Sequence, residues 1–141
     1  MVRWDREAKR ELCEFPGLIA GIVSARGELA DIDLELTAIP SSCRDAPRVA
    51  GGDKRQEEHR LSLLAKKEAL QVQIELAERK QQRIQAALSG LSQEHREVLE
   101  VSCIEGGNVE QIMDSCHVSR SRAFALQGAA LHQYALRRFA G

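Results

Sequence analysis

The chain has 141 residues, of which 43% are apolar, 29% are charged and only 4% are aromatic. This length and composition predict one helix-rich soluble domain, or a small domain with a helical appendage. A formal net charge of −1 excludes a general attraction of the whole molecule to polyanions. No apolar run approaches the length that a bilayer requires, so we expect a cytoplasmic protein with no membrane partner.

Catalytic and metal-binding patterns are missing from the sequence. Cys13, Cys43, Cys103 and Cys116 include no C-x-x-C pair, so their spacing does not suit a metal site. We expect reduced thiols that pack as small hydrophobic side chains. The four histidines are scattered, and the glycine pair at 51–52 does not follow a strand as a phosphate loop would. The sequence therefore predicts no catalytic residues, no metal and no cofactor.

Residues 15–39 carry apolar residues at heptad spacing, which predicts a long amphipathic helix. Pro16 suits the first position of this helix and Pro40 ends it. The preceding segment, Arg3–Cys13, is short and charged, and we expect a separate or kinked helix anchored by Trp4. The two heptad positions are held by Phe15, Ile22, Leu29 and Leu36 and by Leu18, Ala25, Ile32 and Ile39.

A loop and a second heptad follow. Residues 40–53 hold two prolines and a glycine pair, which predict a flexible loop. Two helices joined by one loop predict a long antiparallel hairpin over residues 1–90. This hairpin suits either an intramolecular scaffold or the interface of a homodimer, and Lys67 and Gln81 interrupt its apolar seam. The apolar positions of the second heptad are Leu63, Leu70, Ala77, Ile84 and Leu91, with Ile74 and Leu88.

Residues 91–141 carry the start and stop signals of several short helices. Ser92, Asn108 and Ser119 each stand where a helix N-cap is expected. A tight turn at 117–118 separates the last two helices, as in a helix-turn-helix. We therefore predict an all-α protein in which a coiled-coil-like hairpin precedes a C-terminal helix-turn-helix domain at 91–141. The expected inward side chains are Val98, Leu99, Val101, Ile104, Ile112, Cys116, Ala123 and Leu126.

The last helix of this motif has the features of a DNA-reading helix. From residue 117 to the end of the chain there are four arginines and no acidic residue. Burial of the inward positions leaves Arg120, Ser121, Arg122 and Gln127 facing outward, with Phe124 at the margin. Arginine can bridge guanine edges or bind phosphates, and glutamine can pair with adenine. The alternative is a solvated helix face that contacts nothing.

Three further residues complete the candidate DNA-binding set. Ser119 could contact a phosphate, although its position makes it foremost a helix cap. Arg137 and Arg138 could contact phosphates too, or could be solvated charges favoured by the helix dipole near the carboxyl end.

The segment Leu91–Leu131, and especially Val118–Phe124 within it, resembles the helix-turn-helix of sigma-factor domain 4. In such motifs the turn usually has glycine where this chain has His117, a residue type that tolerates a left-handed backbone better than most. The order of elements along the whole chain resembles small phage and prophage proteins related to late-transcription regulators of the RinA and ArpU types. This resemblance implies double-stranded DNA binding in a promoter region, with RNA polymerase as a further partner.

Two functions therefore remain open at this point. The first is a sequence-specific transcription regulator that acts as a dimer, because two subunits double a small number of phosphate contacts. The second is a protein-interaction module whose hairpin binds a partner such as RNA polymerase or a phage assembly protein, without direct DNA reading. The near-neutral net charge favours the second, and the basic last helix favours the first.

Overall fold

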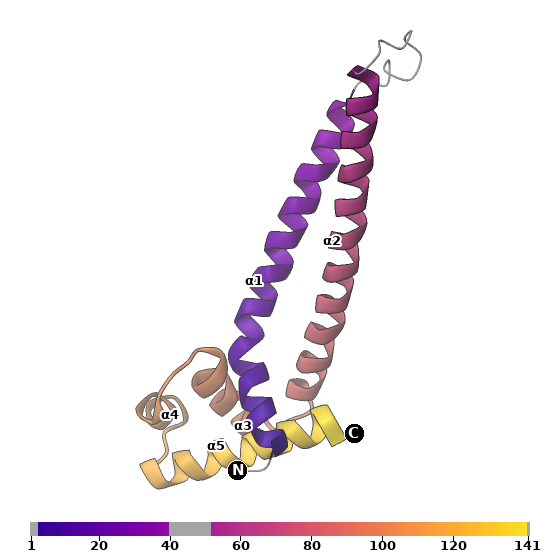
Figure 1. Cartoon of the computed structure of the whole chain (residues 1–141). Coiled ribbons are helices and arrows are strands. Elements are labelled where there is room, and N and C mark those ends of the chain that lie inside the picture. Colours follow the sequence, from indigo (N-terminus) through magenta and orange to yellow (C-terminus); the bar gives the residue numbers. More distant parts are fainter. Residues whose placement is uncertain (1–2, 40–51, 141) are drawn as a thin grey trace. The chain divides into compact units, whose positions relative to one another are not determined.

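The computed structural model describes residues 3–39 and 52–140, and every described element is a helix, so the predicted all-α class is confirmed (Figure 1). The predicted loop at 40–53 lies outside the described residues except for its last two positions, where a helix has already begun. The elements are α1 (Arg3–Ala38), α2 (Gly52–Ser89), α3 (Gln93–Leu99), η2 (Glu100–Ile104), α4 (Val109–Cys116), α5 (Arg120–Ala135) and η3 (Leu136–Ala140).

The chain divides into two compact units. One unit, here called the arm, consists of residues 20–78 and therefore contains the distal parts of α1 and α2. The other, here called the head, consists of residues 1–19 and 79–141. The predicted helix-turn-helix at 91–141 lies wholly within the head, which also takes in the beginning of α1 and the end of α2.

The arm is the antiparallel helical hairpin that the heptads predict (Figure 1). Ile22, Leu63 and Ile74 are its buried side chains, and the other heptad positions of the arm are half-buried. Lys67, the polar residue that interrupts the apolar seam of the arm, forms an ion pair: its Nζ lies 2.8 Å from the carboxylate of Asp33. In the same hairpin, Arg26 pairs with Glu78, and Glu35 pairs with His59. Residues later in α1 therefore pair with residues earlier in α2, as antiparallel helices require.

Of the two alternatives predicted upstream of Pro16, the separate helix is wrong, because this segment is part of α1. α1 runs without a break from Arg3 to Ala38 with Pro16 inside it, although an internal proline removes one backbone hydrogen bond and costs about 3 kcal/mol. Burial explains the continuity, because Ala8, Leu12 and Phe15 are buried at helical spacing on one face. Trp4 is 42% exposed, so Leu12, which is 0% exposed, is the anchor instead.

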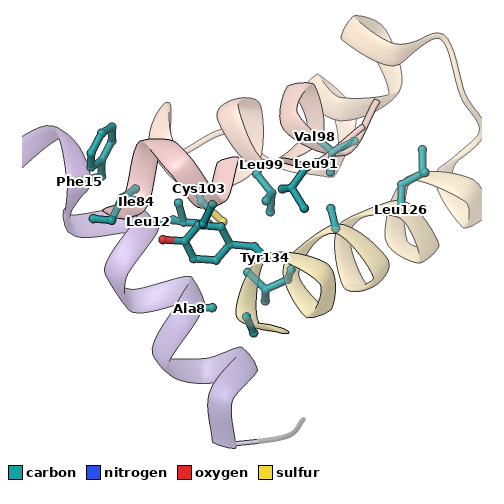
Figure 2. Packing of buried hydrophobic residues seen from close by; sticks show 14 of the residues in the cluster. Ala8, Leu12, Phe15, Ile84, Leu91, Val98, Leu99, Cys103, Leu126 and Tyr134 are labelled. Atoms are coloured by element: carbon teal, nitrogen blue, oxygen red, sulfur yellow. The ribbon is translucent and has the colours of Figure 1, made fainter. Parts of the chain in front are cut away.

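The core of the head joins segments from both ends of the chain. Figure 2 shows Tyr134 of α5 pointing into this cluster, which Leu12 of α1, Ile84 of α2 and Leu99 of α3 also enter. Tyr134, Leu12, Ile84 and Leu99 are all 0% exposed. A region of about fifty residues buries only a modest fraction of its surface alone. Residues 91–140 therefore complete their core with the ends of the two long helices.

A polar network closes this core on one side. Glu11 of α1 accepts hydrogen bonds from the Tyr134 hydroxyl at 2.6 Å and from Arg138 Nε and Nη2 at 2.8 and 3.2 Å. The side chains of Arg138 and Glu11 are only 16% and 10% exposed. Burial, and then the hydrogen bond to Glu11 and its negative charge, raise the pKa of Tyr134 well above its ordinary value of 10.0.

This shift predicts how stability depends on alkaline pH. A raised pKa in the folded state means that Tyr134 contributes stability that is fully present below about pH 10 and is lost as the pH rises further. We expect the free energy of unfolding to fall by up to about 1.4 kcal/mol per pH unit above pH 10, and Tyr134→Phe to remove this component. Urea unfolding of both proteins over that range measures the difference. Because Tyr134 is the only tyrosine, tyrosinate absorbance in the folded protein near pH 10 would contradict the prediction.

Candidate nucleic-acid interface

The turn between α4 and α5 fixes where α5 begins. His117 has φ 55° and ψ 49°, the left-handed conformation that favours glycine, and the N–H groups of His117 and Val118 both donate to the carbonyl of Met113. The left-handed turn expected at His117 is therefore present. Ser119 is then extended, and its side-chain oxygen accepts a hydrogen bond from the Arg122 N–H at 3.2 Å.

The other two predicted caps are also confirmed. The Ser92 hydroxyl accepts a hydrogen bond from the His95 N–H at the start of α3. Asn108 forms a reciprocal capping box with Gln111 at the start of α4, with hydrogen bonds of 2.9 and 3.0 Å. These two caps fix where α3 and α4 begin, as Ser119 does for α5.

Packing of α4 against α5 determines which side of α5 faces outward. Ile112 is 1% exposed, and Ala123 and Leu126, on the facing side of α5, are 0% and 3% exposed. The small side chain of Ala123 leaves room for the two helices to approach closely. Cys116 is half-buried against this core, and burial, followed by the charges of Glu97 and Glu94, raises its pKa.

The outward side of α5 carries most of the predicted contact residues. Arg120, Ser121, Arg122 and Phe124 are exposed, and Gln127 is half-buried. At 100° per residue, Ser121 lies at the centre of the exposed face, with Arg120 and Phe124 along one edge and Arg122 along the other. The structure thus brings these residues together on the first two turns of one helix.

The two arginines have different surroundings. The Arg120 guanidinium lies over the Phe124 ring at 5.9 Å from its centroid, and the ring is itself exposed, which orders both side chains at the surface. Arg122 Nη2 lies 3.6 Å from the carboxylate of Glu94 on α3, with both side chains about half exposed. The sequence did not indicate Glu94 as a partner of Arg122, because the two residues lie on different helices, α3 and α5, with α4 between them.

The remaining predicted residues are not part of this face. The oxygen of Ser119 serves the helix cap. Arg138 is held by Glu11, and Arg137 packs against the backbone of Gly90. Eighteen residues of helix separate Arg120 from Arg138, a rise of about 27 Å at 1.5 Å per residue. Sequence reasoning missed Glu11 as well, because a pairing across so long a stretch of chain leaves no local signal.

Other kinds of site find no support in the part of the chain that the structure describes. No three histidine, cysteine or acidic side chains within residues 3–39 and 52–140 are grouped to hold a metal ion. Across the same ranges, no helix has both the length and the apolar character needed to span a bilayer.

Comparison with known proteins gives a family and no closer relative. The profile of a family described as "Protein of unknown function (DUF1492)" matches residues 38–135, which is more than half of the chain. The match runs from the end of α1 to the end of α5 and so includes the whole of the interface described above. No curated protein and no solved structure shows significant similarity to the chain.

Proposed function

The chain belongs to the DUF1492 family, which is associated with phages, and we propose that it is a sequence-specific, double-stranded-DNA-binding regulator of transcription. The observation that carries the proposal is the outward face of α5, where Arg120 and Arg122 flank Ser121 immediately after a capped turn. Helix-turn-helix proteins place the first turns of their second helix in the major groove. This role is one of binding rather than catalysis, and it belongs in the cytoplasm, where the DNA is.

Each residue of the face has a chemical role in such a complex. Arg120 and Arg122 reach guanine edges or phosphates, and Ser121 can donate to a phosphate. The exposed ring of Phe124 suits contact with a thymine methyl group, and Gln127 can pair with adenine at the edge of the footprint. The small centre of the face, with Ser121 and Ala125, lets the helix backbone approach the base edges closely.

We further propose that the protein acts as a dimer and beside RNA polymerase. A single α5 supplies few cations, and Glu94 already offsets part of the charge of Arg122, so one subunit would bind weakly at physiological ionic strength. A second subunit joined through the arm doubles the phosphate contacts. The resemblance to sigma-factor domain 4 adds promoter DNA and RNA polymerase as the setting.

The test is DNA binding by a double variant of α5. Duplexes are first selected from a randomised library with the wild-type protein, and affinities are then measured by fluorescence anisotropy at low salt. We expect Arg120→Ala/Arg122→Ala to weaken binding at least about tenfold, since each base or phosphate contact contributes about 1–3 kcal/mol. Unchanged affinity would exclude this docking mode.

A matched control removes two charges elsewhere in the head. Arg10→Ala/Lys80→Ala takes away two exposed cations from α1 and α2 and should leave affinity near the wild-type value. Glu94→Gln, which frees Arg122 from its acidic neighbour, should bind at least as tightly as the wild type. An equal loss in the control variant would show that only total charge matters, which would contradict reading by α5.

A protein-interaction module is the second candidate, and the arm carries the observation that favours it. Five large apolar side chains of the arm are more than half exposed, which is the surface expected of a helix-binding partner site. Sedimentation with and without DNA separates the two candidates, because a module of this kind would associate with protein and leave the DNA free. The five residues are Val23, Leu34, Leu61, Val72 and Leu76.

A further inference from the structure

A groove with an unusual concentration of arginines lies at the other end of the head from the α5 interface. It has a volume of about 610 Å³ and is lined by Arg83, Ala86 and Ala87 of α2 and by Arg137 and Arg138 of η3. No acidic residue lines it. Its size falls within the range of pockets that take small molecules or short peptide segments, about 300–1,000 Å³.

Two of the three guanidinium groups in the groove have no acidic partner in the described part of the chain that offsets their charge. Arg138 is paired with Glu11 through two hydrogen bonds and is largely buried. Arg83 and Arg137 are exposed, and within the described residues neither has an ion pair or a hydrogen bond. Two like charges that line the same groove repel each other. An anionic group that enters the groove relieves that repulsion.

The Arg137 guanidinium occupies the space that a side chain at Gly90 would fill. A Cβ atom at Gly90 would lie 2.8 Å from Arg137 Cζ, closer than real Cβ contacts come, and 3.1 Å from Nε, so the guanidinium would have to move away. The guanidinium therefore lies against the Gly90 backbone, at the carboxyl end of α2, where the helix dipole favours a cation.

The chemistry of the lining selects the class of ligand. Two arginines suit carboxylate or phosphate groups, which they bind through paired hydrogen bonds. The lining offers no aromatic ring on which a base could stack and only alanine methyl groups as a floor, which suit an aliphatic side chain. The groove lies about 26 Å along the helix from Arg120, so a duplex held by the start of α5 is not expected to fill it.

We propose that the groove binds an acidic peptide segment of a partner protein, with Arg83 and Arg137 pairing to its carboxylates. This site is separate from the α5 face, so the proposal of peptide binding does not depend on whether α5 binds DNA.

The test uses the full chain and a fluorescent peptide of repeated Asp-Leu-Glu units, compared with its Asn-Leu-Gln counterpart. We expect measurable binding of the acidic peptide alone, weakened at least about tenfold in Arg83→Gln/Arg137→Gln, since hydrogen bonds to charged groups contribute about 1.5–3 kcal/mol each. Gly90→Ala leaves the charge unchanged and displaces Arg137, so it should weaken binding severalfold. Arg10→Gln/Lys80→Gln is the charge-matched control and should behave as the wild type.

Several results would overturn the proposal. Equal binding of both peptides, or equal losses in the control and in Arg83→Gln/Arg137→Gln, would show that the groove does not recognise carboxylates. Side-chain NMR signals of Arg83 and Arg137 should shift with the acidic peptide. If they shift with duplex DNA or with inorganic phosphate and not with the peptide, the anion is a phosphate and the peptide assignment fails. Loss of DNA affinity in the Arg120/Arg122 double variant alone leaves this inference unaffected.

Discussion

Replacing Glu11 with alanine should lower the free energy of unfolding of the head by about 3 kcal/mol, because it leaves the buried charge of Arg138 without a partner. Glu11 accepts three hydrogen bonds, two from Arg138 and one from the Tyr134 hydroxyl, and the two charged side chains are less than one-fifth exposed. Urea unfolding followed by the fluorescence of Trp4, the only tryptophan, measures the change in the head.

Two further variants separate the loss of the pair from the loss of one partner. Glu11→Leu/Arg138→Met removes both charges and should recover most of the stability that Glu11→Ala loses, since a buried ion pair often contributes little over an apolar pair. Glu7→Ala, which breaks an exposed pair with Arg3 on the same helix, should change stability by less than about 1 kcal/mol. Equal effects of Glu11→Ala and Glu7→Ala would contradict a structural role for the network.

Leu12→Ala should destabilise the head by about 3 kcal/mol, within the range of about 2–5 kcal/mol for a buried leucine. Leu12 is 0% exposed and packs in the same cluster as Tyr134 and Leu99, so its removal leaves a cavity in the core of the head. The same Trp4 fluorescence experiment measures the effect.

Leu34→Ala is the matched control on the same helix. Leu34 is 69% exposed, and its truncation should change stability by less than about 0.5 kcal/mol. If the two variants lose equal stability, or if Leu12→Ala loses none, the beginning of α1 is not part of the core of the head.

Local signals predicted a large part of this fold. N-caps, heptads and the turn at His117 depend on residues within a few positions of one another, so propensity and spacing suffice to find them. The outward position of Arg120 and Arg122 followed from the same helical geometry once Ala123 and Leu126 were taken as inward. That these side chains contact DNA stays a prediction.

What the sequence did not show depends on contacts between distant segments. Pro16 indicated a helix start because local preference disfavours an internal proline, yet continuous burial of Ala8, Leu12 and Phe15 outweighs that preference. The partners of Arg122 and Arg138 are acids far away in the chain, and no local pattern distinguishes a free arginine from a paired one. Pairing of Lys67 with Asp33 likewise explains a polar seam position only once the hairpin register is known.

The composition of the head from both ends of the chain has a consequence for biosynthesis. The contacts of Glu11 can form only after residues 134 and 138 have emerged from the ribosome, so the head assembles more than 120 residues after Glu11 has been translated. Closing so long a loop is entropically costly and slow compared with forming the hairpin. A nascent or prematurely terminated polypeptide would thus expose Leu12 and Leu99 to chaperones and proteases and would lack a competent α5.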